Sequence, residues 1–214
     1  MEGTVQERQP NTRGRRAQAA VLSAATQLFA ERGFAGTSIA DIADAAQVAK
    51  PSVLYHFPDK DSLWRACVDT LWNEVDDFYT ERWPTRMRPS RALMERILEL
   101  FVEAALRWPA YVRIPFIEGA TPSWRSEWLV EKHFKTHVLT NDRILRACQE
   151  RGLLRTGTAV QAQLVLTSGI NVVVAQAAMW SSAFETRVDA HSFLDDYVTH
   201  LLDLTFRSKS LDKD

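Results

Sequence analysis

Apolar residues recur every three or four positions along nearly the whole of this sequence. In the first such run, Val21, Ala25, Leu28 and Phe29 fall on one face of a helix. No segment shows the sustained alternation of apolar and polar residues that is typical of a half-buried strand. Eight Gly and eight Pro among 214 residues also leave little room for long connections. The sequence therefore predicts an all-α fold of about nine helices.

Caps and prolines divide this pattern into separate helices. Gly33 follows the first run as a candidate C-cap. Ser38 and Asp41 have the spacing of a capping box, with Asp in place of the usual Glu or Gln. Pro51 falls in the first turn of the third helix, where proline is tolerated. The predicted helices cover approximately residues 21–33, 39–46, 50–57, 59–83, 89–107, 111–118, 122–149, 158–180 and 190–206.

Charge is nearly balanced over the whole chain but not along it. The 26 Lys and Arg against 27 Asp and Glu give a formal charge of −1. Residues 8–60 carry seven of the basic residues and only four acidic ones, so their local charge is +3. A duplex nucleic acid would therefore be attracted to the N-terminal part and repelled by the remainder.

Three features bear on location. Cys67 and Cys148 lie far apart, which excludes a disulfide scaffold and predicts two reduced cytoplasmic thiols. The polar N-terminus is not a secretory signal. Residues 156–184 are uncharged and long enough to cross a bilayer, but they carry many amides and hydroxyls, among them Gln163, Thr167 and Asn171. We expect a helix buried between protein surfaces, no membrane partner and a cytoplasmic location.

The sequence offers little catalytic chemistry. No glycine pair fits a P-loop or dinucleotide fingerprint, and neither G-x-S-x-G nor H-E-x-x-H occurs. His133 and His137 stand four apart on a predicted helix, where both rings can meet one metal with Asp142 or Glu118 as a third ligand. The favoured interpretation is two histidines without a metal. The sequence predicts no enzyme, no cofactor and no metal.

The three short helices before residue 60 give the strongest signal. Residues 38–57 have the pattern of a helix-turn-helix whose second helix, 50–57, enters the major groove. Lys50 and Ser52, beside Pro51 in its first turn, are predicted to face base edges. The residues predicted to contact phosphates are Thr37, Ser38, Tyr55, His56 and Lys60. The open alternatives are that Ser38 only caps a helix, that Tyr55 only packs in the core, and that Lys60 is only solvated.

These residues resemble the tetracycline-repressor-like (TetR) family of bacterial regulators. The resemblance rests on Gly33-Phe34, Thr37-Ser38-Ile39, Asp41-Ile42-Ala43, Ala46, Val48, Lys50, Tyr55-His56-Phe57-Pro58, Lys60 and Leu63. It covers about 50 residues; the remainder is similar only in length and helical pattern. The resemblance implies an N-terminal DNA-binding domain, here residues 1–60 with a flexible arm, and a ligand-binding and dimerisation domain, residues 61–214. It also implies a homodimer through residues 158–180 and 190–206, which binds a palindromic operator and is released by a small molecule.

Four positions depart from the family pattern. Gln47 stands where a turn glycine is usual, so a residue with a side chain must accept a strained turn conformation. Ala49 replaces a common capping Ser, and Pro51 replaces a common Gly. Leu54 replaces a frequent Tyr, so the family's phosphate contact is not carried over to it.

Six of the seven tryptophans lie between residues 64 and 128. They indicate either an aromatic-walled cavity or ordinary core packing, and both interpretations stay open. The candidate ligand-binding residues are Trp72, Phe101, Trp108, Arg113, Phe116, Glu118, Trp128, His133 and His137. The sequence thus predicts a repressor that responds to an apolar or aromatic effector with an anionic group facing Arg113. The alternative is an all-α binding module of the same fold without operator binding.

Overall fold

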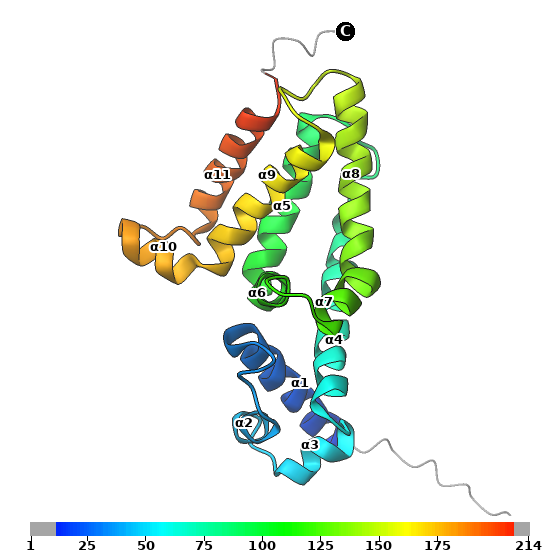
Figure 1. Cartoon of the computed structure of the whole chain (residues 1–214), viewed down its shortest axis with the longest axis vertical. Coiled ribbons are helices and arrows are strands. Elements are labelled where there is room, and N and C mark those ends of the chain that lie inside the picture. Colours follow the sequence, from blue (N-terminus) through cyan, green and yellow to red (C-terminus); the bar gives the residue numbers. More distant parts are fainter. Residues whose placement is uncertain (1–11, 208–214) are drawn as a thin grey trace, which may run out of the picture. The chain divides into compact units, whose positions relative to one another are not determined.

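The computed structural model describes residues 12–207, with side chains from Gly14 onward. Within that range the chain is helical apart from turns and one isolated antiparallel bridge between Leu154 and Phe206 (Figure 1). The predicted all-α class is confirmed. The chain forms two compact units that divide between Thr70 and Leu71, inside helix α4 (Lys60–Arg82). The functional boundary between residues 60 and 61 stays a prediction, and the expected N-terminal arm falls largely outside the described residues.

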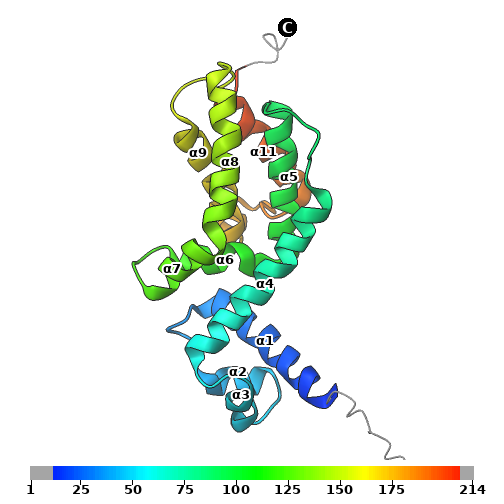
Figure 2. The same ribbon diagram turned by 90° about the vertical axis from the view of Figure 1, so that its right-hand side faces the viewer.

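The first unit contains α1 (Thr12–Arg32), α2 (Ile39–Ala45), α3 (Lys50–His56) and the first turns of α4 (Figure 2). Its core consists of apolar side chains that are almost fully buried: Val21, Ala25, Phe29, Ile42, Val53, Leu63 and Trp64. The capping box begins α2 as predicted. The Ser38 hydroxyl accepts a hydrogen bond from the Asp41 N–H at 3.1 Å, and the Asp41 carboxylate accepts one from the Ser38 N–H at 2.8 Å. The Ser38 hydroxyl, at 2.6 Å, and the Ser38 N–H both donate to the Asp41 carboxylate, and these two bonds lower the pKa of Asp41.

The turn between α2 and α3 contains the strained residue that the sequence predicts. Gln47 has φ = 56°, in the left-handed region that a side chain disfavours. Ala49 occupies the N-cap of α3 and makes no side-chain cap hydrogen bond, while Pro51 begins the helix. The backbone bond from the Val48 N–H to the Ala43 carbonyl, at 3.0 Å, closes the turn in spite of this.

We expect Gln47→Gly to raise the free energy of unfolding by about 0.5–1 kcal/mol. Relief of the left-handed conformation gains about 1–2 kcal/mol, and the greater freedom of glycine in the unfolded chain offsets part of it. Urea unfolding of the full chain measures the change, and Gln47→Ala, which keeps the strain, is the control. A glycine variant less stable than the alanine variant would contradict the interpretation.

The second unit begins with the remainder of α4. Its other elements are α5 (Arg91–Arg107), α6 (Pro109–Glu118), α7 (Trp124–Leu129), the π-helix η1 (Val130–Phe134), α8 (Lys135–Glu150), α9 (Ala159–Ala175), α10 (Ala177–Phe184) and α11 (His191–Thr205). Figure 1 shows α5, α8, α9 and α11 running side by side. Their apolar faces form one core around Ile97, Leu98, Leu166, Ile170 and Leu202.

Two predicted helices are subdivided. The helix expected over 122–149 is α7, η1 and α8, because a π-turn at Val130–Phe134 interrupts it. The helix expected over 158–180 breaks at Gln176, and α9 and α10 meet there at 79°. Among the described residues, no single helix is long and apolar enough to cross a membrane. The bent pair α9–α10 passes that test only by length and composition.

Both cysteines are buried as thiols and form no disulfide. Burial raises the pKa of the Cys67 thiol to about 12. Since the thiolate is the reactive form, Cys67 is chemically quiet in the folded chain.

Candidate nucleic-acid interface and ligand cavity

Helix α3 presents one outer face to solvent. Val53 is fully buried and anchors the helix in the first unit, whereas the Tyr55 side chain is 85% exposed. Lys50 and Pro51 are exposed in the first turn, and Ser52 is half-buried. The structure therefore brings these predicted contact residues together on one short helix, and it does not support a core role for Tyr55.

The two rings at the end of α3 pack on each other, and the His56 ring also lies 6.3 Å from that of the buried Phe57. The Tyr55 and His56 rings meet edge to face with centroids 5.2 Å apart. The phenol and the imidazole therefore lie close together at the surface of the helix. Leu54, where the family pattern often has Tyr, is 40% exposed on the same helix.

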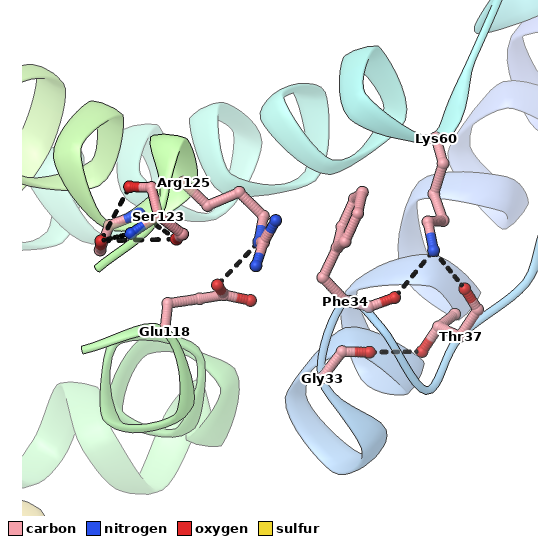
Figure 3. Close-up of polar contacts among 8 residues, drawn as sticks. Gly33, Phe34, Thr37, Lys60, Glu118, Ser123 and Arg125 are labelled. Carbon is pink, nitrogen blue, oxygen red and sulfur yellow. Dashed lines mark hydrogen bonds and ion pairs between the residues drawn. The ribbon is translucent and has the colours of Figure 1, made fainter. Parts of the chain in front are cut away.

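Lys60 is held inside the first unit. Its ammonium donates to the Phe34 carbonyl at 3.0 Å and the Thr37 carbonyl at 3.1 Å (Figure 3). It also lies 4.1 Å from the centroid of the Phe34 ring, a cation–π contact. The ammonium thus fastens the connection between α1 and α2 to the start of α4, which excludes the purely solvated alternative.

Thr37 and Ser38 also use their hydroxyls internally. Thr37 is 1% exposed and its hydroxyl lies 2.9 Å from the Gly33 carbonyl and 3.2 Å from the Leu28 carbonyl. The Ser38 hydroxyl donates to Asp41 at 2.6 Å. Of the residues predicted to contact phosphates, Tyr55 is exposed and His56 is half-buried on α3, while the polar groups of Thr37, Ser38 and Lys60 bond within the α1–α2 connection and the start of α2.

A second candidate site is a cavity of about 200 Å³ inside the second unit. Helices α4, α5, α6, α8 and α9, with Phe134 of η1, supply its walls. It is lined by Trp72, Tyr79, Ile97, Leu98, Phe101, Tyr111, Val112, Pro115, Phe116, Phe134, His137, Val138, Asn141, Gln163, Thr167 and Asn171. An aromatic-walled cavity is therefore present, as one of the two sequence interpretations expected.

Four of the nine predicted ligand-binding residues line this cavity: Trp72, Phe101, Phe116 and His137. The His137 imidazole is paired with Asp76 across 2.9 Å. His133 is buried beside the cavity wall, with its ring 5.4 Å from that of Trp72. Trp128 packs against His133 at 5.2 Å rather than against the cavity.

The other three predicted residues lie elsewhere. The Trp108 indole donates to Glu74 at 2.9 Å. Glu118 is 6% exposed and forms an ion pair with Arg125 at 2.7 Å, next to the Ser123 cap of α7 (Figure 3). Arg113 is half-buried on α6 and is not part of the cavity lining. Glu118 is neutralised by Arg125, which explains how a carboxylate can be buried there.

Sequence reasoning missed the polar wall of the cavity. Gln163, Thr167 and Asn171 stand four residues apart on α9, so they share one face of the helix. This spacing is a signal in the sequence that could have indicated a polar helix face at a cavity. Among the described residues, no group of three His, Cys, Asp or Glu side chains has the geometry of a metal site.

Helices α2 and α3, joined by a short turn, have the arrangement of a helix-turn-helix. Residues 21–67 match the model of the family described as bacterial regulatory proteins, tetR family. An HTH-type transcriptional repressor of Mycobacterium tuberculosis is 51% identical over 57 residues, 27% of this chain and 30% of that protein. The negative regulator IcaR of the biofilm operon in Staphylococcus epidermidis is 33% identical over 58 residues, 27% of this chain and 31% of IcaR.

Several solved structures are similar in fold to this chain over most of its length, the second unit included. HlyIIR, a hemolysin II transcriptional regulator, superposes with a TM-score of 0.68 at 20% identity, covering 91% of this chain and 99% of HlyIIR. The fatty acid degradation regulator FadR of Bacillus halodurans has a TM-score of 0.64 at 15% identity, covering 89% and 97%. The resemblance to the tetR family of bacterial regulators is confirmed over residues 21–67, the part of the chain that the family model matches. The sequence matches span about a third of the curated relatives or less.

Proposed function

We propose that this protein is a ligand-responsive transcriptional repressor that binds a palindromic operator as a homodimer. The observation that carries the proposal is the outer face of α3, where Tyr55 is 85% exposed beside the exposed Lys50 on a helix with a buried anchor. A large aromatic side chain left in solvent is well suited to a nucleic-acid contact, because its hydroxyl reaches backbone oxygens. Binding to DNA implies a cytoplasmic location in a bacterial cell.

The α3 residues divide into two roles under this proposal. Lys50 and Ser52, with Pro51 between them, face base edges in the major groove. Tyr55 and His56 contact the phosphate backbone. Lys60 and Thr37 act as positioning residues, since their polar groups hold the α1–α2 connection from inside, and Ser38 begins α2.

The proposed dimer interface is the apolar groove formed by α9, α10 and α11. Its lining residues are Leu164, Val165, Ser168, Gly169, Val172, Val173, Trp180, Phe184, Thr186, Val188, Phe193 and Tyr197. Leu164 is 58% and Phe184 66% exposed, so a large apolar surface is without cover in the single chain. A second copy of the same surface, related by a two-fold axis, would bury it.

The cavity supplies the ligand response. Helix α4 has residues in both units, and in the second unit its Trp72 and Tyr79 form part of the cavity wall. A ligand that favours a conformation with lower operator affinity must bind more weakly in the presence of operator by the same factor. Arg113 is outside the cavity, and the expectation of an anionic group facing it is therefore not retained.

The alternative proposal is a binding module of the same fold without operator binding. It is favoured by the departures at Gln47, Ala49 and Leu54. Selection from a pool of random duplexes by the full chain separates the two proposals. We expect a near-palindromic motif with half-sites about one helical turn apart, read in successive major grooves. Failure to enrich any sequence would favour the binding module.

Lys50→Ala is expected to relax the base preference at one position of each half-site. Loss of a lysine contact to a base edge costs about 1–3 kcal/mol of discrimination. Competition binding with duplexes that carry each base at that position measures the effect. Lys132→Ala, in η1 of the second unit, is the control and should leave discrimination unchanged. Equal loss of affinity for every base would show that Lys50 contacts phosphate instead.

A further inference from the structure

The cavity in the second unit contains two buried polar atoms without a hydrogen-bond partner. The indole N–H of Trp72 is one, and the whole Trp72 side chain is 0% exposed. The side-chain oxygen of Asn141 is the other. Both residues line the cavity. Because buried polar groups are normally paired, an unpaired donor and an unpaired acceptor at one cavity point to a ligand that satisfies both.

Three of the other polar residues of the wall are already engaged. The Gln163 side-chain N–H donates to the Val138 carbonyl at 3.2 Å. The Thr167 hydroxyl donates to the Gln163 carbonyl at 2.8 Å. The His137 imidazole is paired with Asp76 at 2.9 Å. These internal bonds leave the Trp72 and Asn141 atoms as the natural partners for a bound molecule.

Trp72 is held in place by two rings. Tyr111 meets it edge to face with centroids 5.1 Å apart, and His133 lies against it at 5.4 Å. Because the Trp72 indole is already fixed, little side-chain freedom is lost when its N–H donates to a ligand. Only a ligand with its acceptor at the matching position can form this hydrogen bond.

The cavity lining contains no lysine or arginine, and the imidazole of its His137 is already paired with Asp76. None of the described residues that line it is Lys, Arg, Asp or Glu. Burial raises the pKa of Tyr79 and of Tyr111, so both phenols stay neutral at physiological pH. A carboxylate would lose its hydration without gaining a cation, which is strongly unfavourable. The site therefore favours an uncharged molecule.

Size restricts the ligand to one ring with a small substituent. The volume is about 200 Å³, and a cavity of about 150 Å³ holds benzene. The rings of Phe101, Tyr111 and Phe116 supply apolar and aromatic walls for such a molecule. A long acyl chain exceeds this space.

We propose that the cavity binds an uncharged monocyclic aromatic compound whose substituent accepts a hydrogen bond from the Trp72 indole and donates one to the Asn141 side-chain oxygen. An aromatic carboxamide has both groups on one ring substituent. The inference rests on the proposed ligand response and specifies the chemical class of the effector.

Calorimetric titration of the full chain with benzamide and benzoate at pH 8 tests the charge and hydrogen-bond requirements together. The two probes have nearly the same shape, but benzoate is an anion and has no donor. We expect benzamide to bind at least tenfold more tightly than benzoate, and decanoate to give no binding heat. Equal or tighter binding of benzoate, or no binding of benzamide, would overturn the proposal.

Trp72→Phe and Asn141→Leu test the two hydrogen bonds. Trp72→Phe removes the indole N–H and keeps an aromatic ring. Asn141→Leu replaces the amide with an apolar side chain. We expect each to weaken benzamide binding about tenfold and to change the affinity for ethylbenzene, which has no polar group, by less than about twofold. A parallel loss of both probes in both variants would show that packing alone is involved and contradict the proposal.

The outcome is independent of the regulatory proposal, since the titrations contain no DNA. If benzamide binds as expected but leaves operator occupancy unchanged in a mobility shift, the ligand response fails and the cavity assignment stands. If benzoate or decanoate releases operator while benzamide does not bind, the cavity assignment fails and the regulator stands.

Discussion

Val173→Asp is expected to convert the proposed homodimer into a monomer and to lower operator affinity by at least about 100-fold. Val173 lines the apolar groove of α9–α11. In the dimer, two aspartates would lose hydration near the two-fold axis without a paired cation, at a cost of several kcal/mol per charge. A monomer can bind only one half-site at a time and loses the advantage of linked binding, about 10²–10⁴-fold.

Sedimentation at micromolar concentration measures the first effect, and operator titration measures the second. Val160→Asp is the matched control, because Val160 lies on the same helix, is 49% exposed and is not part of the groove lining. Because Val160 lies one turn before Leu164 of the groove, a second control, Leu139→Asp, is placed on α8, where Leu139 is 43% exposed and outside the groove lining. The Leu139→Asp variant should remain a dimer with unchanged operator affinity. A parent protein that sediments as a monomer, or a dimeric Val173→Asp variant, would contradict the assigned interface.

Lys60→Met is expected to lower the free energy of unfolding by about 2–3 kcal/mol. The ammonium makes two charge-assisted hydrogen bonds, to the Phe34 and Thr37 carbonyls, and such bonds are each worth about 1.5–3 kcal/mol before partial hydration of the freed carbonyls. Chemical unfolding of the full chain measures the loss. Lys50→Met is the control, because Lys50 is exposed and the same change there should cost less than about 0.5 kcal/mol.

The same pair of variants separates a positioning role from a phosphate contact. Under conditions where both variants are folded, Lys50→Met should weaken operator binding more than Lys60→Met. The Lys60 variant should retain the parent's dependence of affinity on salt, since its ammonium is bound inside the domain. A reduction of the salt slope by about one unit in Lys60→Met would instead show that Lys60 neutralises a phosphate.

The N-terminal domain was largely predictable because its signals are local. The capping residues Ser38 and Asp41, Pro51 in the first turn of α3 and the left-handed Gln47 each depend on a few neighbouring residues, and the structure has them as expected. The internal roles of Lys60 and Thr37 were not predictable in this way. Their partners are carbonyls of the α1–α2 connection. Every residue has a backbone carbonyl, so the sequence does not indicate which one accepts a hydrogen bond.

The second unit was predictable in class but not in detail. Composition indicated aromatic walls, but only Trp72 of the six tryptophans between residues 64 and 128 lines the cavity, and Trp64 belongs to the first unit. Which aromatic residue faces a cavity depends on how several helices cross. The break at Gln176 contains neither proline nor glycine, so the local sequence does not predict it.

The proposed function requires that two copies of α3 read the two halves of one palindromic operator. The most direct measurement is a mobility-shift titration with duplex DNA from the region flanking the protein's own gene, compared with the same duplex in which one half-site is scrambled. We expect one dimer per intact duplex and an affinity for the scrambled duplex at least about 100-fold lower. Equal affinity for the two duplexes would contradict the claim.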